Sequence, residues 1–249
     1  TKLWIGDYSK YNDFSELADS STGIKRLGVL RADVDNLGQA FVSGFENTEN
    51  KDKYVTLSRT ATFSRKLSMF FKCYINHILQ NGEFFLEDRE DKSRNVVIVY
   101  AGGDDVFAVG SWDDIIGFSV DLRKALEKYS QGTLTISAGI GIYPSGYPVT
   151  SMARQAGELE EASKGFEGKN AVTLFEDNYT FSWQDFSDKV LNEKYSVVHD
   201  FFTKSQDRGK NFLYNLLDLL RNREEKINLA RYAYFLARME PGEKAPEEQ

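Results

Sequence analysis

The sequence has 249 residues, of which 41% are hydrophobic and 28% charged, the composition of a globular protein with one large or two small domains. The formal net charge of −7 repels nucleic acid, so an RNA contact would need a local basic patch or a partner protein. The single cysteine, Cys73, excludes an internal disulfide and a zinc site built from cysteines.

Neither a membrane span nor a signal peptide is evident in the sequence. We therefore expect a cytoplasmic protein with no membrane partner. The first residue is Thr1 rather than methionine, and the sequence there already resembles the interior of a domain. We expect the chain to be part of a larger protein.

Strand and helix patterns alternate over the first part of the chain. Leu27–Ala32 is a short apolar run that ends at Asp33, which predicts a buried strand with a carboxylate at its end. Apolar residues then recur at helical spacing between Tyr54 and Gln80, and Asn81-Gly82 supplies a stop signal. We expect a short strand at Phe84–Leu86.

The segment Val96–Gly110 predicts a β-hairpin. Two runs rich in β-branched and aromatic residues flank the turn Gly102–Asp105, whose glycines tolerate positive φ and leave space beside the chain. A helix is predicted to start at Ser111. The elements expected after it are a strand at Thr133–Tyr143, a helix at Ser151–Lys164 and a strand at Ala171–Phe175.

This order, β-α-β-β-α-β with an added α-β, predicts an α+β palm with a ferredoxin-like sheet over residues 1–177. After Asp177 helical patterns predominate, which predicts a small all-α domain over 178–249. They lie at Trp183–Leu191, Tyr195–Phe202, Asn211–Leu220 and Ile227–Met239. The polar, proline-containing end, Pro241–Gln249, is expected to be disordered.

Three carboxylates are expected to converge in this fold. The first strand and the hairpin are neighbours in the middle of a ferredoxin-like sheet, so Asp33 should face Asp104 and Asp105. Mg²⁺ takes carboxylate oxygens together with substrate phosphates, and two such metals serve in-line attack of a 3′-hydroxyl at phosphorus. The pattern predicts a metal–nucleotide site.

Phosphate contacts are expected from two further segments. The turn Val34–Gly38 leads toward a helix, whose first backbone N–H groups favour anions. Lys164 at a helix end and Lys169 before the last strand are placed to return over the sheet to a triphosphate. Compensation of the helix dipole is the alternative explanation for either lysine.

Structural explanations compete with this interpretation. A Gly-Gly-Asp-Asp tetrapeptide is by itself a good turn sequence. The ordered set of Asp33, the acidic hairpin and the two lysines nevertheless favours nucleotidyl transfer. His77 and His199 lie singly on apolar helical patterns, which is typical of packing or surface positions rather than of ligands.

Four ordered motifs resemble a known family. They are LRADVDNLG (Leu30–Gly38), YAGGDDVFAVG (Tyr100–Gly110), SAGIGIY (Ser137–Tyr143) and GKNAVTLF (Gly168–Phe175). They resemble the second palm domain of the large subunit of type III CRISPR effector complexes, most closely the III-A version. IGDY (Ile5–Tyr8) and the helical region after Asp177 also resemble that subunit.

The resemblance implies a palm fold shared with polymerases and nucleotidyl cyclases. It further implies that this palm makes cyclic oligoadenylates from ATP when the assembled complex binds target RNA. It also implies that partners are other effector subunits, with guide and target RNA contacted through the complex. Asp33, Asp104 and Asp105 match the catalytic, metal-binding acids, with the Val34 carbonyl as a further ligand of Mg²⁺ or Mn²⁺. The matching substrate-binding positions are Asn36, Leu37, Gly38, Gly102, Gly103, Lys164 and Lys169.

Diguanylate cyclases, which share the palm and a similar hairpin, are the nearest alternative. Here Val106 follows the second aspartate, where those enzymes have phenylalanine. Phe41, Ser43 and Phe45 lie where a polar guanine-reading pair is expected. These departures favour ATP over GTP.

A docking module of the ribonucleoprotein, without catalysis, is the other alternative. The resemblance implies two palms that face each other, preceded by an HD-type nuclease domain. This chain has one palm and no HD motif. We therefore expect an isolated fragment to bind metal and ATP but to cyclise ATP poorly.

Overall fold

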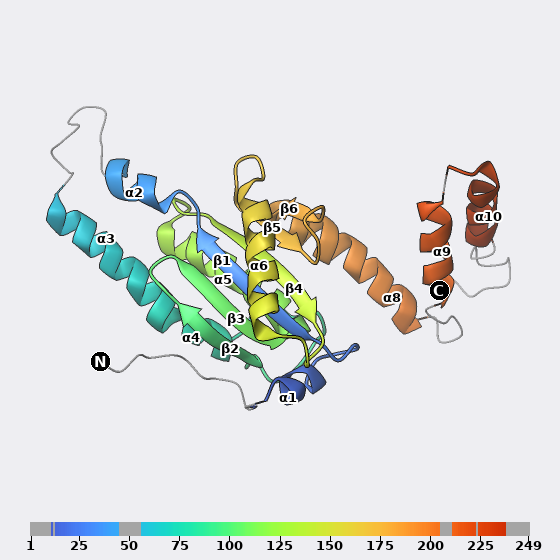
Figure 1. Ribbon diagram of the computed structural model, residues 1–249, viewed down its shortest axis with the longest axis horizontal. Helices are drawn as coiled ribbons and strands as arrows, with labels where there is room; N and C mark the ends of the chain where they lie inside the picture. Colours follow the sequence, from blue (N-terminus) through green and yellow to red (C-terminus); the bar gives the residue numbers. More distant parts are fainter. Residues whose placement is uncertain (1–10, 12, 45–55, 205–210, 223, 238–249) are drawn as a thin grey trace. The chain divides into compact units, whose positions relative to one another are not determined.

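The computed structural model describes residues 11, 13–44, 56–204, 211–222 and 224–237. The chain divides into two compact units, Thr1–Ser187 and Asp188–Gln249 (Figure 1). The sequence placed the end of the palm at Asp177, whereas the first compact unit continues to Ser187. The first unit extends further because Trp183 and Phe186 are buried in it, and the Trp183 indole N–H donates to the Ile136 carbonyl at 2.7 Å.

Six strands of the described residues form one sheet, in the order β2-β3-β1-β4-β5-β6. They are β1 (Leu27–Val34), β2 (Val96–Ala101), β3 (Asp105–Ser111), β4 (Ile136–Tyr143), β5 (Ala171–Leu174) and β6 (Thr180–Ser182). β1 lies between β3 and β4 and runs antiparallel to both, whereas β5 runs parallel to β4. The order β2-β3-β1-β4 is that of a ferredoxin-like sheet, which confirms the predicted α+β palm.

Helices cover both faces of this sheet (Figure 1). α6 (Val149–Lys164) packs on β4 and β1, and α5 (Trp112–Ser130) packs on the central strands from the other face. The shorter helical segments are α1 (Phe14–Asp19), α2 (Leu37–Ser43), α3 (Leu57–Met69), the π-helical turn η1 (Phe70–Tyr74), α4 (Ile75–Gln80) and α7 (Trp183–Asp185). α3, η1 and α4 follow one another without a break and confirm the predicted helix that ends before Asn81.

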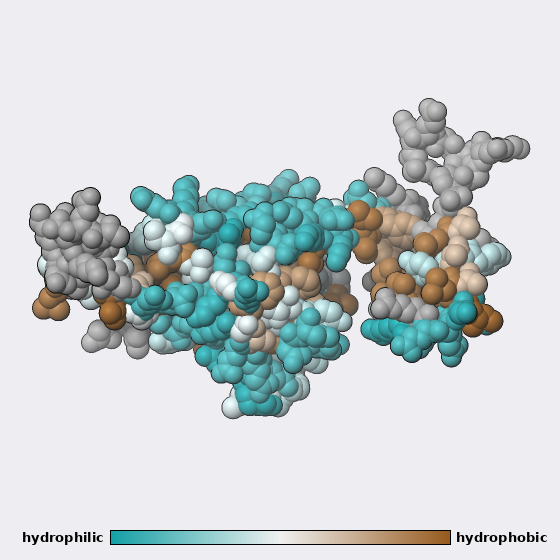
Figure 2. All heavy atoms as spheres, turned by 90° about the horizontal axis from the view of Figure 1, so that it is seen from above, coloured by the Kyte–Doolittle hydropathy of each residue, from teal (hydrophilic) through white to brown (hydrophobic). Residues whose placement is uncertain are grey.

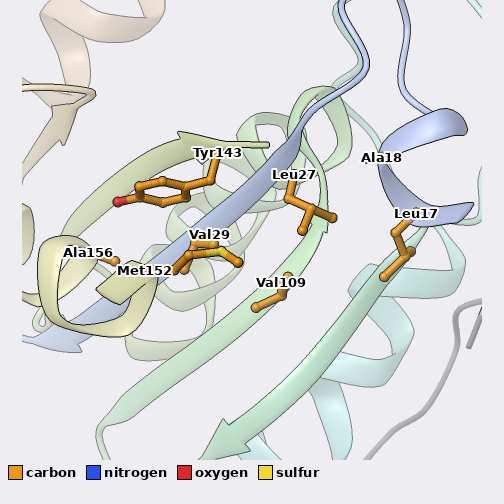
Figure 3. Close-up of a cluster of buried hydrophobic side chains, with 8 residues drawn as sticks. All are labelled: Leu17, Ala18, Leu27, Val29, Val109, Tyr143, Met152 and Ala156. Atoms are coloured by element: carbon orange, nitrogen blue, oxygen red, sulfur yellow. The ribbon is translucent and has the colours of Figure 1, made fainter. Parts of the chain in front are cut away.

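Alternation along β1 assigns its side chains to the two faces. Val29 belongs to a buried cluster on the α6 side, together with Leu17, Ala18, Leu27, Val109, Tyr143, Met152 and Ala156 (Figure 3). Gly28 faces α5, where a Cβ would overlap Ile115, so glycine lets that helix approach β1. Because residues two apart share a face of a strand, Arg31 and Asp33 lie on the α6 side with Val29.

Two described elements were not expected from the sequence. β6 is a three-residue edge strand that pairs antiparallel with β5, and α1 is a helix of six residues. Both are too short to produce a periodic pattern. The short strand predicted at Phe84–Leu86 is not present, because the Glu83 and Phe84 N–H groups donate to the Asp121 carboxylate rather than to a neighbouring strand.

The second unit is helical, as predicted. The π-helix η2 (Phe186–Tyr195) crosses the division, and α8 (Ser196–Lys204), α9 (Asn211–Arg221) and α10 (Lys226–Ala237) follow it. Aliphatic side chains remain exposed on this unit, where Figure 2 shows brown surface, among them Leu217, Ile227 and Leu229. The aromatic side chains of Tyr214 and Tyr234 are exposed as well. The tail Pro241–Gln249 and the IGDY segment lie outside the described residues. Among those residues, no helix combines the length and the hydrophobicity needed to cross a bilayer.

Candidate functional site

Asp33 and Asp105 lie opposite each other on two neighbouring strands. Asp33 is close to the end of β1, Asp105 begins β3, and the antiparallel register makes their Cα atoms partners. One further backbone hydrogen bond, from the Val34 N–H to the Asp104 carbonyl at 3.1 Å, continues this pairing into the turn. The register therefore brings the three acids, Asp33, Asp104 and Asp105, to the same end of the sheet, as the sequence predicted.

The Gly-Gly turn provides space rather than an unusual backbone conformation. The structure gives neither Gly102 nor Gly103 a positive φ, so the turn does not use the left-handed conformation that glycine tolerates. A Cβ on Gly102 would instead overlap the Tyr100 hydroxyl and the Asp105 carboxylate, whereas a Cβ on Gly103 would meet open space. The Gly102 N–H closes the turn by donating to the Asp105 carbonyl at 2.9 Å. Gly102 thus lets the Asp105 side chain take its position.

Negative charge is concentrated at this end of the sheet. Partial burial raises the pKa of Asp104, and the neighbouring charges of Asp33 and Asp105 raise it further, while Lys164 acts in the opposite direction. The charge of Asp105 is also the largest cause of the raised pKa of the exposed Tyr100 hydroxyl. A cation bound among the acids would relieve this repulsion.

Lys164 at the end of α6 supplies a positive charge directly to Asp33. Its Nζ lies 2.5 Å from Asp33 Oδ2 and 2.7 Å from Glu160 Oε1. Burial by itself would lower the pKa of Lys164, but hydrogen bonds to Asp33 and Glu160, together with their charges, outweigh burial and raise it. Lys164 therefore lies at the end of α6 and also contacts one of the three acids directly.

Lys169 lies in a different part of the site. Its Nζ donates to Asn36 Oδ1 at 2.7 Å, and Asn36 itself is left-handed with φ 53° at the start of α2. The Leu37 and Gly38 N–H groups lie in the first turn of this helix, where backbone donors have no intrahelical acceptor. A Cβ on Gly38 would meet open space. The loop after β1 and Lys169 thus form a second cluster of hydrogen-bond donors.

Asp35 is a site residue that the sequence analysis missed. It is only 4% exposed, and its carboxylate accepts from Thr135 Oγ1 and Ser137 Oγ, each at 2.7 Å, and from the Asn170 N–H at 3.1 Å. Asp35 therefore ties the loop after β1 to the start of β4 and to the residue next to Lys169. The sequence signal for this contact was the pair of hydroxyl residues at Thr135 and Ser137, which share one face of the chain at the start of β4.

A cavity of about 480 Å³ opens beside the same loop. Its lining comes from three segments: Asp35, Asn36, Gln39, Ala40 and Gly44; Phe63; and Thr133, Leu134 and Thr135. Ligand pockets typically have volumes of about 300–1,000 Å³. Phe41 does not line the cavity but packs edge-on against Phe63, with ring centroids 4.8 Å apart. The cavity was not foreseen because its walls are far apart in the sequence.

Comparison with known families identifies this arrangement. The model of the Cas10/Cmr2 second palm domain matches residues 26–173, and that of the second helical domain of the CRISPR RNA silencing complex Cmr2 subunit matches residues 199–249. The chain belongs to the Cas10/Cmr2 family. The match covers β1 to β4, the acidic hairpin, α6 and the start of β5, so the site residues described above lie within the matched range.

Individual relatives agree with this assignment. The chain is 47% identical over 253 residues to the subtype III-A "CRISPR system single-strand-specific deoxyribonuclease Cas10/Csm1" of Mycobacterium tuberculosis, a match over 100% of this chain and 31% of that protein. It is similar to Csm1 in the Csm1–Csm4 cassette with cA4, with TM-score 0.70 and 30% identity over 95% of this chain and 35% of that one. In the cassette with one ATP the TM-score is 0.68, with 30% identity and coverages of 96% and 35%. The chain spans about a third of the length of these relatives.

The residues at the hairpin suit a hard divalent cation in their chemistry. Carboxylate and carbonyl oxygens are the ligands that Mg²⁺ and Mn²⁺ prefer. Among the described residues, however, no group of three histidine, cysteine, aspartate or glutamate side chains is arranged as a ready-made metal site. The Asp33 carboxylate holds the Lys164 ammonium in this structure.

Proposed function

We propose that this chain is a nucleotidyltransferase palm that joins ATP into cyclic oligoadenylates within a type III-A CRISPR effector complex. The observation that carries the proposal is the register that places Asp33 opposite Asp105, with Asp104 adjacent and Lys164 bound to Asp33. Further support comes from the relatives, whose Csm1–Csm4 structures contain ATP or cA4.

In this proposal Asp33, Asp104 and Asp105, with the Val34 carbonyl, hold Mg²⁺ or Mn²⁺. Bound cations of this kind activate a ribose 3′-hydroxyl and neutralise a triphosphate. The protein's own contribution is chiefly positioning and electrostatic stabilisation, as is usual in phosphoryl transfer. The acids are held in place by the strand register, and the glycines of the turn give them room.

The polyphosphate is bound by the positive groups around the acids. Lys164 approaches from α6, and the first N–H groups of α2, from Asn36 to Gly38, approach from the loop after β1. Lys169 joins this loop through Asn36. The 3′-oxygen of one nucleotide forms a bond to the α-phosphorus of another, and the bond to pyrophosphate breaks.

ATP is the proposed substrate. The position after the second aspartate, Val106, is 1% exposed, so it serves the core of the sheet rather than a base. Phe41 packs on Phe63 instead of presenting a polar edge. Both observations disfavour the GTP-cyclase alternative, and the nucleotides in the related structures are ATP and cA4.

The proposed partners are the other subunits of the effector complex, with guide and target RNA contacted through the assembly in the cytoplasm. The relatives support this, because Csm1 forms a cassette with Csm4. The relatives are named single-strand-specific deoxyribonucleases. The family resemblance assigns nuclease activity to an HD-type domain, so we do not propose it for this palm.

The test is product formation by the assembled complex. Complexes with the wild-type chain, with Asp104→Ala and Asp105→Ala combined, and with the exposed Asp88→Ala as a control would be incubated with ATP, Mg²⁺ and target RNA. We expect cyclic adenylates from the wild type and from Asp88→Ala, and none from the double variant. Equal ATP binding by all three complexes, without product, would favour the docking-module alternative.

A further inference from the structure

Lys164 is held by a second carboxylate besides Asp33. Glu160 lies one helical turn earlier in α6, and its Oε1 is 2.7 Å from Lys164 Nζ. Its other oxygen, Oε2, is 3.4 Å from the Nε of Arg31 on β1. The Glu160 side chain is 9% exposed, so these two contacts occupy a carboxylate that has little access to water.

Close packing of α6 on the sheet explains why Glu160 is buried. A Cβ on Gly139 of β4 would overlap the backbone N of Glu160, so the absence of a side chain there lets the helix lie directly on the strand. Gly157 plays the corresponding role in the helix, where a Cβ would be 2.8 Å from a terminal nitrogen of Arg31. Two glycines on facing elements therefore bring the guanidinium of Arg31 to Glu160.

The result is a row of alternating charge across the two elements. Arg31 and Asp33 share one face of β1, and Glu160 and Lys164 share one face of α6. The row runs from Arg31 through Glu160 and Lys164 to Asp33. A buried carboxylate is costly unless it is paired, and the arginine supplies a permanent charge for it.

The two carboxylates around Lys164 have different fates in the proposed reaction. Asp33 is a proposed cation ligand, and an acid that binds a cation is no longer the partner of the lysine. Glu160 is held by Arg31 and remains the partner of Lys164. Without Glu160, the lysine side chain would lose its anchor at the moment when a triphosphate arrives.

We infer that Glu160, anchored by Arg31, is a positioning residue that holds the Lys164 ammonium in place for the triphosphate of ATP. The inference rests on the proposed function. Glu160 acts through Lys164 and does not itself touch the nucleotide.

The first measurement tests the placement of Lys164 without any turnover. The assembled complex, free of ATP, is treated with an amine-acylating reagent, and labelling of Lys164 is followed by mass spectrometry. In Glu160→Gln the ammonium loses a charged partner, so we expect labelling to be about fivefold faster than in the wild type. The control is Glu161→Gln, which removes an exposed charge from the next position of the same helix and should leave the rate unchanged.

The second measurement separates binding from chemistry. We expect Glu160→Gln to raise the KM for ATP about tenfold with kcat within about twofold, as for a lost charge-assisted contact in binding. Glu160→Asp should recover part of the change, and Glu161→Gln should match the wild type. Melting temperatures of all variants establish that each is folded. If Glu160→Gln does not fold, the same comparison of labelling and KM is made with Glu160→Asp.

The outcomes separate this inference from the proposed function. Unchanged labelling of Lys164 in Glu160→Gln would overturn the positioning role, even with an active wild type. Faster labelling with an unchanged KM would also overturn it, because Lys164 would then not depend on Glu160 for its contact with ATP. If the wild type makes no product while labelling still depends on Glu160, the proposed function fails and the contact between Glu160 and Lys164 stands.

Discussion

Asp33 of β1 and Asp105 of β3 are directly opposed, and the lysine that ends α6 lies 2.5 Å from the first of them. Three separate parts of the chain therefore meet at one end of the sheet. Two of them bring negative charge and the third brings positive charge. This relationship determines what each substitution below should do.

Lys164→Ala should impair ATP use more than Lys169→Ala does. Lys164 lies against Asp33, one of the proposed cation ligands, whereas Lys169 Nζ donates to Asn36 Oδ1 at 2.7 Å. A charge-assisted contact is worth about 1.5–3 kcal/mol, so we expect the KM for ATP to rise roughly tenfold or more in Lys164→Ala. The effect of Lys169→Ala should be clearly smaller.

Steady-state kinetics of the assembled complex would measure the KM for ATP in both variants. Lys164→Arg is included to show whether a positive charge at this position is enough to keep the KM low. Equal losses in Lys164→Ala and Lys169→Ala would mean that the position of Lys164 beside the acids does not give it the larger part in binding the triphosphate.

The two glycines of the turn should respond differently to alanine. A Cβ on Gly102 would overlap the Asp105 carboxylate and the Tyr100 hydroxyl, whereas a Cβ on Gly103 would meet open space. Displacement of a reacting group by about 1 Å costs up to about a hundredfold in rate. We expect Gly102→Ala to lower kcat by roughly ten- to a hundredfold and Gly103→Ala to have a much smaller effect. Similar kcat values for the two variants would contradict the assigned role of Gly102.

Asp35→Asn should loosen the loop after β1. Asp35 accepts three hydrogen bonds, from Thr135, Ser137 and the Asn170 N–H, and an amide accepts at only one of its two heavy atoms. In hydrogen–deuterium exchange of the assembled complex, we expect amides of residues 35–40 and 168–171 to exchange about tenfold faster. The exposed Asp88→Asn is the control. Exchange that is unchanged in both variants would show that Asp35 does not hold these segments together.

Much of the palm was predictable because its signals are local. Leu27–Ala32 has the apolar run of a central strand, and the Gly-Gly-Asp-Asp turn lies between two strand-forming segments. Once these elements were arranged as a ferredoxin-like sheet, the meeting of Asp33 with Asp104 and Asp105 followed from topology. The register of β1 with β3 agrees with that expectation.

The remaining features depend on packing that no local pattern records. Asp35 and Glu160 are acids in polar stretches of sequence. Asp35 is buried where it accepts hydrogen bonds from residues at the start of β4, and Glu160 is buried because α6 packs on the sheet beside Arg31. The role of Gly139 likewise arises from a helix distant in the chain. Trp183 belongs to the first compact unit for the same reason, because the acceptor of its indole N–H, the Ile136 carbonyl, lies on β4.

The most direct test of the central claim is a structure of the assembled complex with ATP and Mn²⁺, in which the ion is located by its anomalous scattering. We predict Mn²⁺ in direct contact with carboxylate oxygens of Asp33 and of the Asp104–Asp105 pair, with Lys164 released from Asp33 and directed at the triphosphate. A nucleotide-bound structure in which Asp33 keeps Lys164 and the ion binds elsewhere would contradict the account.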